Sequence, residues 1–113
     1  MTRLLCVAPE LPVEQLESAL DWYRARLGFV MRLRMEDYAI VARNGVDLHL
    51  FKAAAGDGPI SLHIFATDLT ELAADMESRG VEFAQGLTDQ PWGTRDFRIK
   101  DSFGNLLKFT EAH

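Results

Sequence analysis

The sequence predicts an α+β fold in which the order strand, helix, three strands occurs twice along one chain. Two apolar helical stripes recur at a constant offset, and segments that alternate apolar and polar residues follow each stripe. Between the two copies lies a run of small and turn-forming residues, AAAGDGP, at about residues 53–59. We therefore expect a single domain over residues 1–113, with module 1 at about 1–54 and module 2 at about 60–113.

Composition and charge narrow the class of protein. The chain has 113 residues, enough for one hydrophobic core, and no apolar run approaches the roughly 20 residues needed to span a bilayer. A start without a signal sequence and a single cysteine, Cys6, fit a cytoplasmic protein, in which Cys6 is expected to be a small buried apolar residue. The net charge of −5 argues against nucleic acid as a partner. A small molecule or another protein remains.

Module 1 begins with an alternating segment, Arg3 to Ala8, which predicts a strand ended by Pro9 and Pro12. The helix that follows carries an apolar stripe and stops at Gly28. The stripe consists of Leu16, Ala19, Leu20, Tyr23 and Leu27. Three strands then follow, at about 31–35, 38–42 and 46–51, and Asn44-Gly45 predicts a tight hairpin turn between the last two.

Module 2 repeats this order. Residues 60–66 alternate as a strand, and Asp68 with Glu71 three residues later predicts a capping box at the start of a helix that Gly80 ends. The helical stripe consists of Leu69, Leu72, Ala73 and Met76. A strand around Phe97 and a closing strand at 106–110 flank the turn Asp101–Asn105, where Gly104 supplies a backbone conformation that other residues avoid.

Alternation assigns each strand residue to one of two faces. The face toward the helices is expected to hold Leu5, Val7, Val46, Leu48, Leu50, Leu62, Ile64, Phe97, Ile99, Leu107 and Phe109. The opposite face is expected to hold Leu4, Cys6, Ala8, Asp47, His49, Phe51, Ser61, His63, Phe65, Asp96, Arg98, Lys100, Leu106, Lys108 and Thr110. This second face mixes aromatic, imidazole and charged groups, which is typical of a ligand cleft, although a solvated sheet surface is the alternative.

Several motifs resemble the glyoxalase, bleomycin-resistance and extradiol-dioxygenase superfamily. They are LPV at 11–13, DWYRARLGF at 21–29, DLHLF at 47–51, PWGTRDF at 91–97 and DSFGNL at 101–106. The likeness spans nearly the whole chain, and the PWGTRDF stretch is most similar to the bleomycin-resistance branch. The resemblance implies two tandem βαβββ modules whose mixed sheet curls around a cleft, in a homodimer.

Enzymes of this superfamily typically hold a divalent metal with one side chain from each of four strands. The resemblance places those positions on Ala8, His49, Ser61 and Lys108, of which only His49 is a good ligand. The alternative is a displaced site that uses His49, His63 and an acid such as Asp47. His113, at the end of the sequence, is expected to take no part. We therefore expect no metal, no cofactor and no catalytic residues.

The resemblance then implies a binding protein that sequesters an antibiotic or another aromatic compound. The expected ligand-binding residues are His49, Phe51, His63, Phe65, Trp92, Arg98 and Lys108. The acidity of the chain suits a cationic drug, whereas Arg98, Lys100 and Lys108 favour an anionic or neutral aromatic ligand. Two alternatives are a metal-dependent isomerase, lyase or dioxygenase centred on His49 and His63, and a scaffold without a ligand.

Overall fold

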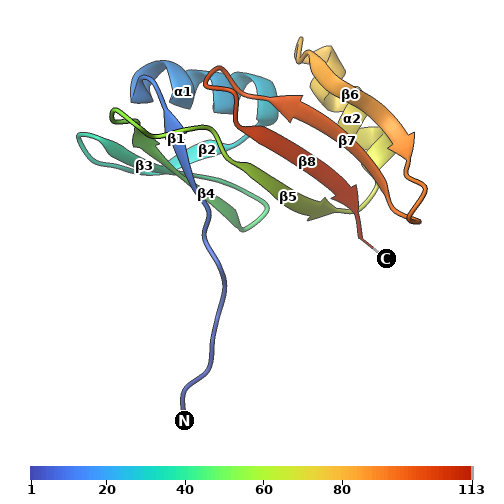
Figure 1. The fold of residues 1–113 in the computed structure, drawn as a ribbon, viewed down its shortest axis with the longest axis horizontal. Helices are drawn as coiled ribbons and strands as arrows, with labels where there is room; N and C mark the ends of the chain where they lie inside the picture. Colours follow the sequence, from blue (N-terminus) through green and yellow to red (C-terminus); the bar gives the residue numbers. More distant parts are fainter. Residues whose placement is uncertain (113) are drawn as a thin grey trace.

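The computed structural model describes residues 1–112, so the expectation for His113 lies outside the described residues. Module 1 contains β1 (Glu10–Val13), α1 (Leu16–Trp22), η1 (Tyr23–Leu27), β2 (Val30–Arg34), β3 (Tyr38–Arg43) and β4 (Val46–Lys52). Module 2 contains β5 (Ser61–Ala66), α2 (Leu69–Ser78), β6 (Phe83–Asp89), β7 (Arg95–Lys100) and β8 (Leu106–Glu111). The predicted α+β fold of two βαβββ modules is confirmed (Figure 1). No helix within residues 1–112 is long and apolar enough to cross a membrane.

Each module builds its own four-stranded mixed sheet. We call them sheet A, ordered β1-β4-β3-β2, and sheet B, ordered β5-β8-β7-β6. In both sheets the first strand of the module pairs in parallel with the last, and the other pairs are antiparallel. Glu10 is therefore opposite His49 in sheet A, as His63 is opposite Lys108 in sheet B. The repeat read from the sequence is thus a repeat of topology.

The first helix follows the predicted stripe. Four of its five apolar residues are buried, and Leu20 is half-buried. The helix changes from α geometry to a π turn at Tyr23 and ends at Gly28, which has φ of 70°. A left-handed residue at this point is the usual C-terminal stop, and glycine adopts it without a steric penalty.

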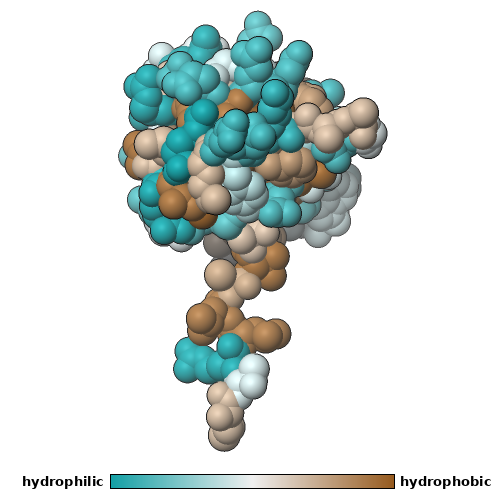
Figure 2. Space-filling view, turned by 90° about the vertical axis from the view of Figure 1, so that its left-hand side faces the viewer, coloured by the Kyte–Doolittle hydropathy of each residue, from teal (hydrophilic) through white to brown (hydrophobic). Residues whose placement is uncertain are grey.

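The predicted strand Arg3–Ala8 is wrong. The first eight residues project from the body of the molecule, and Figure 2 shows hydrophobic side chains along this arm. Leu5 and Val7, expected in the core, are almost fully exposed, and Val46 is exposed as well. The arm alternates like a strand but pairs with no strand within residues 1–112, and a strand requires pairing as well as alternation.

The first strand lies instead at Glu10–Val13, parallel to β4. Leu11 and Val13 bury their side chains completely or almost so. Pro12 lies inside this strand, where it was expected to end one. A proline is tolerated there because β1 is an edge strand, so its missing N–H leaves no ladder partner unsatisfied.

Local signals at two turns have different outcomes. Asn44 and Gly45 both have positive φ, 52° and 78°, which confirms the predicted hairpin turn. Asp68 is the N-cap of α2, but its backbone is left-handed and its side chain makes no capping hydrogen bond. The expected capping box is therefore wrong, and Glu111 on β8 accepts the Leu69 N–H instead, at 3.4 Å.

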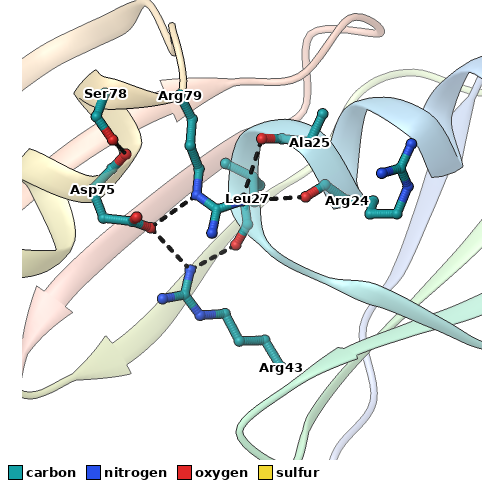
Figure 3. Close-up of polar contacts among 7 residues, drawn as sticks. All are labelled: Arg24, Ala25, Leu27, Arg43, Asp75, Ser78 and Arg79. Carbon is teal, nitrogen blue, oxygen red and sulfur yellow. Dashed lines mark hydrogen bonds and ion pairs between the residues drawn. The ribbon is translucent and has the colours of Figure 1, made fainter.

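Arginines join the C-terminal ends of the two helices (Figure 3). The Arg79 guanidinium donates to the carbonyls of Arg24 and Ala25, at 3.4 and 3.3 Å, and Arg43 donates to that of Leu27 at 2.7 Å. The Arg24 carbonyl also accepts the Gly28 N–H at 3.2 Å, whereas the Ala25 and Leu27 carbonyls lie at the helix end, where carbonyls lose their intrahelical partners, so the arginines cap the helix. In return Arg26 donates to the carbonyl of Gly80. Arg26 and Arg79 occupy matching positions of the two modules, because they are separated by the same number of residues as the two helical stripes.

The Asp101–Asn105 turn joins the two modules through buried polar groups. Gly104 has φ of 97°, as expected. The Asp101 carboxylate accepts the Tyr23 hydroxyl at 2.7 Å, while the Asn105 amide donates to the Pro12 carbonyl at 2.7 Å and accepts the Ile60 N–H at 2.9 Å. This turn therefore stabilises the junction of η1, β1 and β5.

Candidate functional site

A row of polar side chains crosses sheet B on the face away from the helices. His63 on β5 is in register with Lys108 on β8, and Lys108 is in register with Arg98 on β7. The row ends at Gln85 on β6. Because residues directly opposite in a sheet share a face, the structure brings three predicted ligand-binding residues together here. We call His63, Lys108 and Arg98 the basic row.

The basic row contains one cation without a compensating charge. Arg98 pairs with Asp96 at 3.1 Å, whereas Lys108 forms no ion pair with any residue of the described chain. Like charges opposite one another in a sheet are destabilising unless something balances them. Lys108 is half-buried beside Arg98, so an anionic group bound there would relieve this repulsion.

Asp96 lies two residues before Arg98 on β7 and on the same face of the sheet, but its side chain is only 2% exposed. Burial by itself raises the pKa of its carboxyl group, but hydrogen bonds from the Gln90 and Gln85 amides and from Arg98 outweigh it and lower that pKa. The carboxylate therefore fixes Arg98 in place rather than contacting a ligand.

An aromatic surface adjoins the basic row. The Phe65 side chain is 66% exposed, and its ring stacks on the His63 imidazole with centroids 6.0 Å apart and planes 22° from parallel. A hydrogen bond of 3.1 Å joins His63 Nδ1 and the Thr110 hydroxyl. An exposed flat surface next to cations can hold an aromatic ring and its charged substituent.

The other two predicted strand residues, His49 and Phe51, lie on β4 in sheet A. Tyr38 contacts His49 there: its hydroxyl lies 2.5 Å from His49 Nδ1 and donates to Glu10 at 2.8 Å. Burial first, and Glu10 second, raise the pKa of the Tyr38 hydroxyl. Tyr38 and Glu10 were missed because their strands meet β4 only in the folded sheet, although Tyr38 begins a predicted strand.

Trp92 stands apart from both groups. It lies in the turn between β6 and β7 and is 66% exposed. The structure therefore divides the predicted site into the basic row with Phe65, the pair His49 and Phe51, and Trp92 by itself.

The residues do not fit the divalent metal of the superfamily's enzymes. Ala8 has no donor atom, Ser61 is a poor ligand, and the Lys108 ammonium would repel a cation, which leaves His49. The displaced site of His49, His63 and Asp47 does not fit a metal either, because the Asp47 carboxylate pairs with Arg32 at 2.8 Å. Within residues 1–112 no group of three or more His, Cys, Asp or Glu residues is placed to hold a metal ion.

A cavity of about 610 Å³ lies elsewhere, between the β3–β4 turn and α2. Its apolar lining includes Phe29, Ile64, Leu72, Met76 and Phe109. Of the residues predicted to bind a ligand, Phe65 alone lines this cavity. Asp68, Glu71 and Asp75 line it together with one cation, Arg43. Sequence patterns missed this cavity because Asp68 and Glu71 resemble a helix cap and the apolar residues resemble ordinary core.

The arrangement of the two modules has close counterparts among known structures. The bleomycin resistance determinant encoded on transposon Tn5 matches with a TM-score of 0.86 at 25% identity, covering 97% of this chain and 99% of that one. A bleomycin-binding protein in complex with bleomycin matches with a TM-score of 0.81 at 24% identity, covering 97% and 100%. TioX from Micromonospora sp. ML1 matches with a TM-score of 0.81 at 24% identity, covering 92% and 95%. These likenesses define the class of protein: a two-module α+β chain with the bleomycin-resistance fold.

Sequence comparison gives the family. The chain belongs to the glyoxalase/bleomycin resistance protein/dioxygenase superfamily, whose model matches residues 4–109. The bleomycin resistance proteins of Geobacillus stearothermophilus and Staphylococcus aureus are each 26% identical over 121 residues, which cover 89% of this chain and 92% of theirs. The resemblance seen in the sequence motifs is thereby confirmed.

Proposed function

We propose that this protein is a small-molecule binder of the bleomycin-resistance type that acts by sequestering an aromatic compound. The observation that carries the proposal is the half-buried Lys108, which has no charge partner in the described chain and lies between His63 and Arg98. The ligand's ring would stack on Phe65, and an anionic substituent would bind Lys108.

A cationic ligand is the second candidate, and the cavity beside α2 favours it. One of the similar structures is a bleomycin-binding protein in complex with bleomycin. In this chain the apolar lining of the cavity is bordered by Asp68 and Glu71, which form no ion pair with a described residue, and by Asp75, which pairs with Arg43 and Arg79. A cationic ligand would gain apolar contact and charge complementarity there, whereas the basic row would repel it.

Calorimetric titration with bleomycin and with a panel of anionic aromatic compounds separates the two candidates. If the basic row binds the ligand, Lys108→Glu should weaken the anionic compound at least tenfold and improve cationic-drug binding, with Glu71→Gln as the matched control that changes neither. Bleomycin binding that Glu71→Gln weakens and Lys108→Glu leaves unchanged would assign the ligand to the cavity. No binding of any compound would favour a scaffold role.

We also propose that the functional unit is a homodimer. The arm at residues 1–8 presents Leu4, Leu5 and Val7 to solvent (Figure 2). A second set of exposed apolar residues lies on β2 and at the residue that follows it. The second set is Val30, Met31, Leu33 and Met35. Burial of such surfaces against a second copy would stabilise them at about 25 cal/mol per Å². Light scattering after size-exclusion chromatography should give twice the chain mass, and a monomer at micromolar concentration would refute the proposal.

The same proposal places the protein in the cytoplasm and gives it no metal. One exposed cysteine, Cys6, suits a reducing compartment, and the four superfamily metal positions offer one good ligand, His49. Elemental analysis of untagged protein grown with Mn, Fe, Ni and Zn tests the second point. About one metal per chain, lost in a His49→Ala/His63→Ala variant, would support the isomerase, lyase or dioxygenase alternative instead.

A further inference from the structure

Three residues on the open face of sheet A form a continuous hydrogen-bond chain. Glu10 on β1 is in register with His49 on β4, and Tyr38 at the start of β3 lies between their side chains. The Tyr38 hydroxyl donates to Glu10 Oε2 at 2.8 Å and lies 2.5 Å from His49 Nδ1. The two rings meet edge to face, with centroids 5.6 Å apart and planes at 82°. The hydrogen-bond chain therefore forms only when β1, β3 and β4 are paired in sheet A.

The direction of the hydrogen bonds follows from the number of protons. A tyrosine hydroxyl has one hydrogen, and an ionised carboxylate can only accept. The Tyr38 hydrogen therefore goes to Glu10, and the phenol oxygen is left to accept from His49 Nδ1. A neutral imidazole carries one hydrogen, so if it lies on Nδ1, then Nε2 is a bare acceptor.

His49 Nε2 is open to an outside partner. Within residues 1–112 it makes no hydrogen bond, and no buried side-chain nitrogen or oxygen in that part of the chain lacks one. Because His49 is half-buried, its unbonded Nε2 must reach the surface. His63 differs, since its partner is the Thr110 hydroxyl, which can donate or accept and so imposes neither tautomer.

We propose that Glu10 and Tyr38 are positioning residues that hold neutral His49 with its hydrogen on Nδ1, so that Nε2 accepts a hydrogen bond from an N–H or O–H group of the ligand. This inference rests on the proposed binding function, and it adds a ligand contact on sheet A, separate from the basic row, that requires an N–H or O–H donor. The carboxylate of Glu10, at the far end of the chain, strengthens the acceptor by stabilising positive charge that the imidazole gains from a ligand proton.

The first test reads the tautomer without any ligand. Long-range ¹H–¹⁵N NMR spectra of the ¹⁵N-labelled protein, recorded at a pH where the imidazoles are neutral, distinguish a protonated Nδ1 from a protonated Nε2. The wild type should show His49 protonated on Nδ1. Tyr38→Phe removes the acceptor, and Glu10→Leu removes the oxygen that takes the phenol hydrogen, so that the phenol can donate to His49. Both variants should therefore move the His49 proton toward Nε2 while the His63 signals stay unchanged. His49 protonated on Nε2 in the wild type, or unaltered in both variants, would overturn the positioning role.

The second test uses a matched pair of flat probes, benzimidazole and 1-methylbenzimidazole, which differ in a single N–H donor. The wild type should bind benzimidazole about 5- to 10-fold more tightly, as one hydrogen bond would give. In Tyr38→Phe the two affinities should become equal because Nε2 no longer accepts. Equal affinities in the wild type would overturn the donor requirement. Failure of both probes to bind would overturn the donor requirement, whereas the proposed function is decided separately by the titrations with bleomycin and anionic aromatic compounds. The NMR result is independent of ligand binding and decides the positioning role.

Discussion

Replacing Asn105 with alanine tests whether the Asp101–Asn105 turn holds the modules together. The Asn105 side chain is 0% exposed and makes hydrogen bonds with the Pro12 carbonyl, the Ile60 N–H and the Asp101 carboxylate. Alanine would leave the first two of these groups without their partner. Asp101 would keep its bonds from Tyr23 and from the backbone N–H groups of residues 103 and 105.

The magnitude follows from the two orphaned backbone groups. Each buried polar group left unsatisfied costs about 1–3 kcal/mol, so the two groups together mean that Asn105→Ala should lower the free energy of unfolding by about 2–6 kcal/mol. That is a large part of the roughly 5–15 kcal/mol typical of a domain. The assay is urea unfolding followed by circular dichroism and by tryptophan fluorescence.

A matched control separates this effect from simple loss of a polar side chain. Thr88→Ala removes an exposed hydroxyl whose hydrogen bond is local, to the Gly86 carbonyl, and should change stability by less than about 0.5 kcal/mol. A loss below about 1 kcal/mol for Asn105→Ala, with an unchanged dependence on urea, would refute the reasoning. It would mean that water replaces the Asn105 amide at the junction.

Two further predictions concern pH. Burial, and then Asp101, raise the pKa of the Tyr23 hydroxyl well above its usual range, so the folded state retains this proton more strongly than the unfolded state does. The stability that the Tyr23 proton gives is complete below about pH 10 and is lost as the pH rises through the folded-state pKa. The midpoint of urea unfolding should therefore fall more steeply above about pH 10 in the wild type than in Tyr23→Phe. Equal slopes in the two proteins would contradict the assignment. Burial raises the pKa of Asp96, but hydrogen bonds from two glutamine amides and from Arg98 lower it by more, so the net shift is downward. The stability that the Asp96 carboxylate gives is therefore present above about pH 4 and disappears as the pH falls through its folded-state pKa. Asp96→Asn should therefore show a shallower loss of stability between about pH 4 and pH 2, which acid unfolding measured at several urea concentrations would detect.

Much of the fold could be predicted because it is specified by short-range patterns. The helical stripe that includes Tyr23 and Leu27 follows from a period of 3.6 residues, and strand faces such as Leu48 and Leu50 against His49 follow from a period of two. Asn44-Gly45 and Gly104 adopt the positive φ values that their residue types favour. In each case the physical cause lies within a few residues along the chain.

The candidate site was predicted less completely because its residues meet only through strand pairing. His63, Lys108 and Arg98 were each placed on the open face, but their alignment in one row depends on the register of β5, β8 and β7. The burial of Asp96 was not predicted, since alternation cannot reveal that β6 and the loop after it supply glutamine amides to cover a carboxylate.

The sequence by itself determined that this protein has two βαβββ modules, where its turns lie and which superfamily it belongs to. The tertiary structure decided that β1 begins at Glu10 rather than Arg3, that the arm leaves the body, and that Glu10, Tyr38 and His49 meet. The physical reason is the range of the interactions. Periodicity and turn geometry depend on neighbouring residues, whereas strand partners, buried polar networks and hydrogen-bond chains depend on groups far apart in sequence, whose contacts exist only after the chain has folded.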